Sequence, residues 1–441
     1  MSNELKKTLS PFQLWAIIVG MVISGMYFGW NNAMAFTSPV GFLIATVIVT
    51  IFYGTFMFSY AEMSTALPKA DASGEFASRT MGRFVGFIAA YSCVLEFLFA
   101  TPAIAISVGA YINFIFPSIP VTAAGLVVYA LFVIINCFDV KTAAIIETVV
   151  TIVAILGLVI FVGSSAPHIQ TVKLFGGDVF KGGFSGIFAA VPFAIWFYLG
   201  AEGGAMSAEE CKNPKKDIPK SFIFAIGTLV VLAIVTFACT AGVLDVKALG
   251  TTNSPLPDTL AAIFGKDNML SKFMSFIGLF GLIASLHGLM IGYSRQVFAM
   301  SRANFLPKFL SKVNSKGAPV PAIIIPSLVG MIFVLTNNTA IIIVISCFGA
   351  IVLHALSMIA FFLLRRNEPG LERPYKVSLV FPVIALILNV VFLITTIYSN
   401  VSTISWVLFS FVVAAMYYFV YTKISSKANK GAYESDIEEV I

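Results

Sequence analysis

The sequence predicts an all-α polytopic membrane protein, and two observations carry that prediction. Of the 441 residues, 59% are hydrophobic and only 11% are charged, and the mean hydropathy is +0.96. This apolar fraction exceeds what the core of a soluble protein needs. The apolar residues are also gathered in runs of roughly 18 residues or more, long enough to cross a bilayer as helices.

Twelve such runs follow one another, and their connections leave no room for a soluble domain. The first run lacks a small-residue cleavage site and has glycine-rich polar residues at its centre, so we expect a retained helix rather than a signal peptide. The expected transmembrane helices lie near 12–36, 41–65, 84–112, 121–138, 143–163, 185–209, 221–244, 269–301, 320–336, 339–364, 378–399 and 403–422.

The distribution of Lys and Arg predicts the orientation of these helices. If the N-terminus is cytoplasmic, most of the 27 basic residues fall in cytoplasmic segments. An even number of spans then places the tail, 425–441, on the same side, in a multi-pass protein of the plasma (inner) membrane. The net charge of +6 follows from this topology and needs no nucleic-acid partner. The five cysteines lack metal-ligand spacing, so neither a metal site nor a cofactor is expected.

Two of the expected spans are interrupted near their middle by glycine and polar residues. The stretch VISGMYFGWNN, residues 22–32, interrupts the first span, and FYLGAEGGAMSAEE, residues 197–210, interrupts the sixth. Irregular backbone at membrane depth is tolerated only where it lines a cavity enclosed by protein. A single glycine is explained as well by helix packing, but two clusters at equivalent positions favour a substrate site.

The two interrupted spans begin two blocks of five spans, 12–163 and 185–364. An odd number of spans inverts the second block relative to the first. This is the inverted-repeat layout of secondary transporters, which hold their substrate at the interface between the repeats. Two additional helices follow at 378–422, and we expect the whole chain, 1–441, to form a single transporter domain.

Several segments resemble the amino acid, polyamine and organocation (APC) superfamily of transporters: YAEMSTALPKADASGEF, GAEGGAMSAEECKNPKKDIPKSF and GYSRQVFAMSRANFLP. The resemblance implies a LeuT-like fold with discontinuous helices 1 and 6, substrate held between spans 1, 3, 6 and 8, and alternating access. AAVPFAIWFYLGAEGGAMSAEECKNPKKDIP and LIASLHGLMIGYSRQVFAMSRANFLP are most similar to bacterial ethanolamine permeases. The chain is therefore expected to import ethanolamine or a similar small organic cation. An amino-acid or diamine/GABA transporter or exchanger of the same superfamily is the alternative.

Ethanolamine carries an ammonium and a hydroxyl group but no carboxylate, so its site needs negative charge, carbonyl dipoles or aromatic faces. Amino-acid carriers of the superfamily have a glycine-rich first break that holds a carboxylate, whereas bulky residues follow Gly25 here, which mildly favours a substrate without one. The expected site residues are Ser24, Gly25, Tyr27 and Phe28 of the first span, Trp196, Tyr198, Gly200 and Glu202 of the sixth, and Glu96 and His287 of the third and eighth.

Ionisable residues inside spans carry the most information, because burying each is costly unless it is paired, neutralised or hydrated. Glu96 lies at the centre of the third span and is expected to face the cavity and meet a cation; a protonated Glu96 bonded to a neighbouring helix is the alternative. His287 is expected to serve the site or a proton relay, or else to join two helices, and His354 is favoured for the latter role. The resemblance implies that Glu202 supports the broken sixth span by accepting N–H bonds freed by the glycines; direct contact with the substrate ammonium is the alternative.

The coupling ion is left open by the sequence. Some relatives carry a lysine in the fifth span that mimics sodium, but the matching position here is near Ala154. Proton symport through Glu96 or His287, sodium symport, exchange and uniport all remain. An intramembrane enzyme would need a paired nucleophile and base or a metal cluster, and a channel would need polar rings at several depths. Neither pattern is found.

Overall fold

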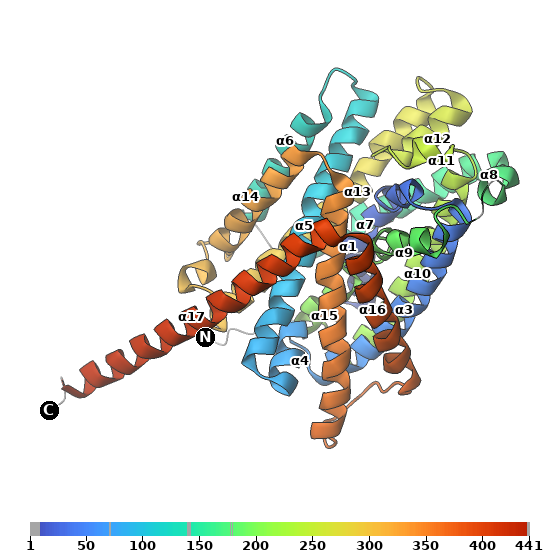
Figure 1. Ribbon diagram of the computed structural model, residues 1–441. Helices are drawn as coiled ribbons and strands as arrows, with labels where there is room; N and C mark the ends of the chain where they lie inside the picture. The colour runs from blue at the N-terminus through green and yellow to red at the C-terminus, as the bar shows by residue number, and fades with distance from the viewer. Residues whose placement is uncertain (1–8, 70–71, 139–142, 177, 179, 439–441) are drawn as a thin grey trace.

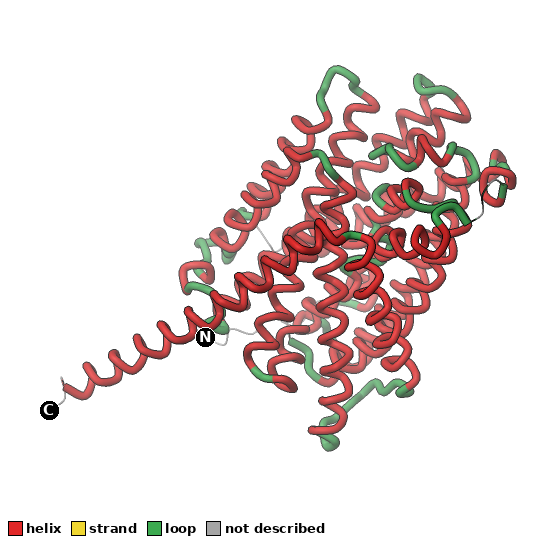
Figure 2. The backbone as a smooth tube through the Cα atoms, viewed as in Figure 1, coloured by secondary structure: helices red, strands yellow, loops and turns green. Residues whose placement is uncertain are grey.

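The computed structural model describes residues 9–438 except 70–71, 139–142, 177 and 179, and gives the backbone alone at 143–146, 209 and 423–438. Within these residues every regular element is a helix, and the loops gather at the two ends of the bundle (Figure 2). Nine of the described helices are long and apolar enough to cross a membrane, and three shorter apolar helices complete the twelve expected spans. The prediction of an all-α polytopic membrane protein is confirmed.

The first and sixth spans are both interrupted. The first consists of α1 (Pro11–Val22), α2 (Ser24–Tyr27) and the 3-10 helix η1 (Trp30–Ala35), and the sixth of α9 (Gly183–Ile195) and the 3-10 helix η3 (Ala201–Glu210). The other spans are α3 (Pro39–Ala66), α5 (Arg83–Ile115), α6 (Val121–Asn136), α7 (Ala143–Ser165), α10 (Pro214–Ala241), α13 (Met269–Arg302), α14 (Val320–Thr336), α15 (Thr339–Asn367), α16 (Val380–Ser399) and α17 (Val401–Glu438).

Short helices connect these spans. They are α4 (Ala72–Met81), η2 (Ala166–His168), α8 (Thr171–Phe175), α11 (Val246–Leu249), α12 (Pro255–Phe264) and η4 (Lys308–Ser311). The last span was expected to end at 422, but the backbone of α17 stays helical to Glu438 and projects from the bundle (Figure 1). The first part of the expected tail thus continues the helix, and 439–441 lie outside the described residues.

Local sequence signals fix where the first helices begin. Ser10 caps α1 by accepting the Gln13 N–H, and the Gln13 side chain accepts the Ser10 N–H in return. The Ser38 side chain caps the start of α3, and both helices carry proline at their first position, where no N–H is needed. These caps set the start of the first span, which contains the first break, and of the span that follows it.

Helix α5 lies at the centre of the bundle, packed between α13 and α15 (Figure 1). The apolar stretch of α5 is 89% buried inside the protein, far more than the apolar stretches of the peripheral helices α16 and α17. A helix that is apolar all round belongs in such an interior position. The packing places Glu96, in the middle of α5, away from lipid and toward the sixth span.

Candidate substrate site

The first break occurs where Phe28 leaves the helix and Gly29 turns the chain. Phe28 is fully extended, and Gly29 has φ 93°, a conformation that favours glycine. A Cβ on Gly29 would also collide with the indole of Trp196. Glycine is therefore required at this position both for the turn and for the close approach of the sixth span.

Neutral groups satisfy the backbone around the first break. The Ser24 N–H donates to Ser285 Oγ (3.0 Å), which itself donates to the Gly20 carbonyl (2.7 Å). The Gly29 N–H donates to Asn31 Oδ1 (2.9 Å), and the Asn31 amide group donates to the carbonyls of Leu249 and Thr252. These bonds fix the broken segment to α13 on one side and to the loop after α11 on the other.

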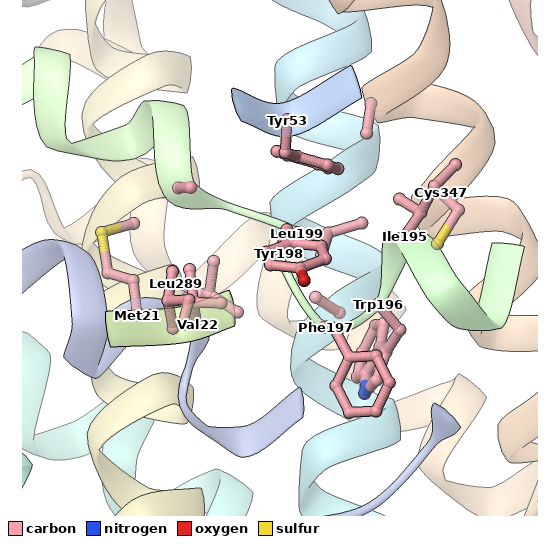
Figure 3. Packing of buried hydrophobic residues seen from close by; sticks show 14 of the residues in the cluster. Met21, Val22, Tyr53, Ile195, Trp196, Phe197, Tyr198, Leu199, Leu289 and Cys347 are labelled. Carbon is pink, nitrogen blue, oxygen red and sulfur yellow. The ribbon is translucent and has the colours of Figure 1, made fainter. Parts of the chain in front are cut away.

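The sixth break is a longer unwound segment. Helix α9 ends at Ile195, and the chain passes through Trp196 and Tyr198 to Gly200, which is left-handed with φ 89° (Figure 3). The Trp196 indole donates to the Phe28 carbonyl (3.0 Å). The Gly200 N–H donates to Oε1 of Glu96 (3.1 Å). The carboxylate that accepts the N–H freed at this glycine is therefore Glu96, and not Glu202 as the sequence suggested.

The two breaks touch each other. A Cβ on Gly25 would collide with the carbonyl oxygen of Trp196, so the two backbones meet without a side chain between them. The rings of Phe28 and Trp196 pack edge to face with centroids 5.5 Å apart. Two interrupted spans in backbone contact beside their breaks are the arrangement expected of a transporter site built from discontinuous helices.

Beside the sixth break lie three ionisable side chains that we call the buried triad: Glu96 of α5, Glu202 of η3 and His354 of α15. One ligand-type atom from each lies within 4.8 Å of the other two. Nε2 of His354 is 3.4 Å from Oε1 of Glu202, and a carboxylate oxygen of Glu96 lies within 4.8 Å of one of Glu202. The triad is almost completely shielded from solvent, with exposures of 0%, 2% and 1%. Such a set can hold a proton or a cation.

A second buried pair lies on the other side of α1. Nδ1 of His287 in α13 is 3.7 Å from Oε2 of Glu147 in α7, and the His287 side chain is 14% exposed. A Cβ on Gly20 would collide with the Glu147 carboxylate, so the pair packs directly on α1. His287 therefore faces Glu147 of α7 and the ring of Phe132 of α6.

Most of the expected site residues surround the two breaks. Ser24, Gly25, Phe28, Trp196, Gly200, Glu96 and Glu202 lie there, all of them buried. The Tyr27 hydroxyl instead donates to the Ala154 carbonyl (2.6 Å) in α7, at the position where the lysine was sought. The Tyr198 hydroxyl bonds to Thr50 of α3 (2.6 Å). Contact of these residues with a substrate remains a prediction.

Some residues of this region were missed or underrated by sequence reasoning. His354 was assigned to helix joining, and its imidazole does connect α15 to η3, but its partner Glu202 was not foreseen. Asn31 and Ser285, which tie down the first break, were not singled out. The signal for His354 was available, because an imidazole in an apolar span needs a polar partner and few carboxylates lie at that depth. Short polar side chains such as Ser285 gave no comparable signal.

Comparisons with known proteins agree with this architecture. The chain matches the family model described as amino acid permease over residues 9–402. It is 26% identical to the branched-chain amino acid permease BcaP of Bacillus subtilis (strain 168), covering 97% of this chain and 96% of that protein. It is 23% identical to the aromatic amino acid transport protein AroP of Escherichia coli (strain K12), over 77% of this chain and 76% of that protein.

A third relative is a putative histidine permease of Bacillus subtilis (strain 168), 25% identical over 77% of this chain and 74% of that protein. These relatives are named for amino acids, so the resemblance to the APC superfamily is confirmed, whereas the narrower resemblance to ethanolamine permeases stays a prediction. The matched family spans both broken helices and the buried triad. The chain belongs to the amino acid permease family and is a multi-pass membrane transporter rather than an enzyme.

Proposed function

We propose that this protein is a secondary transporter that carries an amino acid across the plasma membrane by alternating access, with both termini in the cytoplasm. The observation that carries the proposal is the direct contact of the two broken spans at Gly25 and Trp196. Relatives that cover 97% and 77% of the chain are named for amino acid transport, which supports this substrate class.

The geometry suggests how access alternates. Gly29 and Gly200 both have positive φ, and each sits where one half of a broken span joins the other. Hinges of this kind absorb large backbone rotations while the packed helices beside them stay rigid. The Trp196 indole donates a hydrogen bond to the Phe28 carbonyl and so joins the sixth span to the first. Substrate entry requires that this bond open, and release on the other side requires that η3 or α1 tilt away.

Ethanolamine is a second candidate, and one structural feature favours it. The N–H groups of Ser24 and Gly29, which could hold a substrate carboxylate, already donate to neutral side chains. The carboxyl groups of Glu96 and Glu202 lie beside the opposite break, where they would attract an ammonium group. A site with carboxyl groups at one end and satisfied N–H groups at the other suits an amine without a carboxylate.

Ligand-dependent thermal stability of the purified protein separates the two candidates. A ligand that binds only the folded state at 100 times its Kd stabilises it by about 2.7 kcal/mol. We expect a rise in Tm with leucine, phenylalanine or histidine and little change with ethanolamine, putrescine or GABA. The reverse pattern would establish the amine candidate. Counterflow in proteoliposomes then tests transport, because a channel does not support it. A protein that responds to none of these solutes would contradict both candidates.

A further inference from the structure

We propose that the buried triad is a shared-proton site whose loss of a proton releases η3, so that transport is coupled to proton movement. The proposal rests on the proposed function for its consequence in transport. Its structural part stands on Glu96, Glu202 and His354 alone. It assigns a role to the one place among the described residues where three such groups come together in the bundle interior.

The buried polar atoms of the triad need an added proton to complete their hydrogen bonds. Oε2 of Glu96, both carboxylate oxygens of Glu202 and Nε2 of His354 are buried without a satisfied hydrogen bond. Two ionised carboxylates cannot donate to each other, although oxygens of Glu96 and Glu202 lie within 4.8 Å of each other. A proton between these carboxyl groups and an imidazolium on His354 would satisfy all of these atoms.

The same arrangement is the one that carries no net charge. One shared proton on two carboxyl groups leaves one negative charge, which the His354 imidazolium balances. Removing a proton leaves a buried negative charge, and burying a charge without a partner is strongly unfavourable. Two carboxylates within contact distance also repel each other. The three residues therefore gain and lose protons as one unit.

Neighbouring groups do not supply the missing compensation. The other ionisable side chains that interact with the two carboxyl groups are Tyr53 and Tyr60 of α3 and Cys347 of α15; Tyr198 in turn interacts with Tyr53, and Cys93 of α5 with Tyr60. All five are ordinarily neutral near pH 7. The aromatic ring of Phe56 lies 4.3 Å from that of His354 and adds no charge. The protons that balance the two carboxyl groups must therefore reside within the triad.

The triad connects η3, which the proposal expects to move, to α5, which is packed firmly against α15. The main-chain carbonyl of Glu96 accepts the Ser346 hydroxyl (2.5 Å), and a Cβ on Gly349 would come within 2.8 Å of the Glu96 nitrogen, so α5 and α15 are packed backbone to backbone. Glu202 belongs to η3, which begins after the left-handed Gly200. Repulsion between deprotonated Glu96 and Glu202 would push η3 away from α5 about that glycine. Protonation would draw η3 back.

The first experiment needs no substrate. Infrared spectroscopy of the purified protein at neutral pH should show the C=O band of a buried protonated carboxylic acid. Glu96→Gln and Glu202→Gln should each remove it, because a single remaining carboxylate pairs with the imidazolium. Glu372→Gln, at an exposed residue paired with Lys215, should retain it. Absence of the band in the native protein, or its persistence in both triad variants, would overturn the proposal.

The second experiment measures coupling in proteoliposomes that contain a pH-sensitive dye, with leucine and ethanolamine as test solutes. Uptake by the native protein should change the lumenal pH. Glu96→Gln keeps the hydrogen bond but cannot ionise, so the change in lumenal pH per solute molecule taken up should be lost in the uptake that remains. His354→Gln serves if that variant fails to fold. Uptake driven by sodium without a pH change would overturn proton coupling. If neither solute is transported, the proposed function fails while the infrared result still decides the proton site.

Discussion

The two broken spans differ in what holds them. The first break is held by hydroxyl and amide groups: Ser285 on Ser24, Asn31 on Gly29, and the Tyr111 hydroxyl on the Tyr27 carbonyl. The sixth break is held at Gly200 by a carboxylate that belongs to the buried triad. The strength of the first set does not depend on pH between about 5 and 8, because none of its groups titrates there. The second depends on a proton.

This difference suggests that the two breaks have different roles within one site. A break tied by neutral bonds offers a constant surface to the substrate. A break tied through titratable groups can respond to an ion while the rest of the bundle stays packed. The contact at Gly25 and Trp196 transmits a displacement of one break to the other, since no side chain lies between the backbones. The substrate and the proton can thereby both act on the contact between Gly25 and Trp196.

The largest effect is expected from adding one methyl group at the contact between Gly25 and Trp196. In Gly25→Ala the Cβ collides with the Trp196 carbonyl oxygen, a backbone atom that no rotamer change can move. Overpacking of this kind costs about 1–3 kcal/mol, and we expect loss of transport with normal membrane insertion. Uptake in proteoliposomes provides the measurement.

Two other glycines serve as controls for Gly25→Ala. Gly203→Ala should reduce transport less, because its Cβ meets the terminal methyl group of the flexible Met21 side chain. Gly54→Ala in α3 should behave like the native protein, because its Cβ meets open space. Full transport by Gly25→Ala would show that the two backbones need not meet closely.

The next effect tests the neutral break. Asn31→Ala removes the acceptor for the Gly29 N–H and the donor for two loop carbonyls. Each buried group left unsatisfied costs about 1–3 kcal/mol, so thermal unfolding should begin several degrees lower. Transport should fall by the same factor at every pH between 5 and 8. A factor that changes with pH would remove the distinction between the breaks.

The titratable break should show the opposite behaviour. His354→Gln keeps a donor near Glu202 but cannot become a cation, so the triad loses its means of balancing a carboxylate. We expect the pH profile of uptake to flatten between pH 5 and 8, measured under counterflow and under an imposed gradient. His168→Gln, on the exposed η2, is the matched control and should keep the native profile. An unchanged profile in His354→Gln would exclude His354 from the proton site.

The smallest effect concerns Tyr198, which lies on the sixth break without belonging to the triad. Tyr198→Phe removes one hydrogen bond to Thr50 and leaves the ring packed against Tyr53. The net contribution of one such bond is about 1 kcal/mol. Thermal stability should fall slightly and the pH profile should stay native. A large loss of ligand binding would instead indicate that the hydroxyl contacts the substrate.

The sequence was sufficient for the spans and the breaks but not for the contacts between them. Apolar runs have a length set by the bilayer, and glycines with polar neighbours mark unwound backbone, so Gly29 and Gly200 stood out. Helix rotation decides which side chains meet across spans, and aromatic residues are too common here to indicate a facing side. The sequence indicates that His354 needs a polar partner, but identifying that partner as Glu202, and that of His287 as Glu147, required the packed structure.

Hydrogen exchange of the two breaks as a function of pH tests the central claim most directly. After correction for intrinsic exchange rates, peptides covering 197–210 should lose protection as pH rises and the triad gives up its shared proton. Peptides covering 22–32 should keep theirs. In Glu96→Gln, which cannot ionise, the 197–210 segment should stay protected across the range. Parallel behaviour of both segments in the native protein, or a pH response that persists in Glu96→Gln, would contradict a proton-held sixth break.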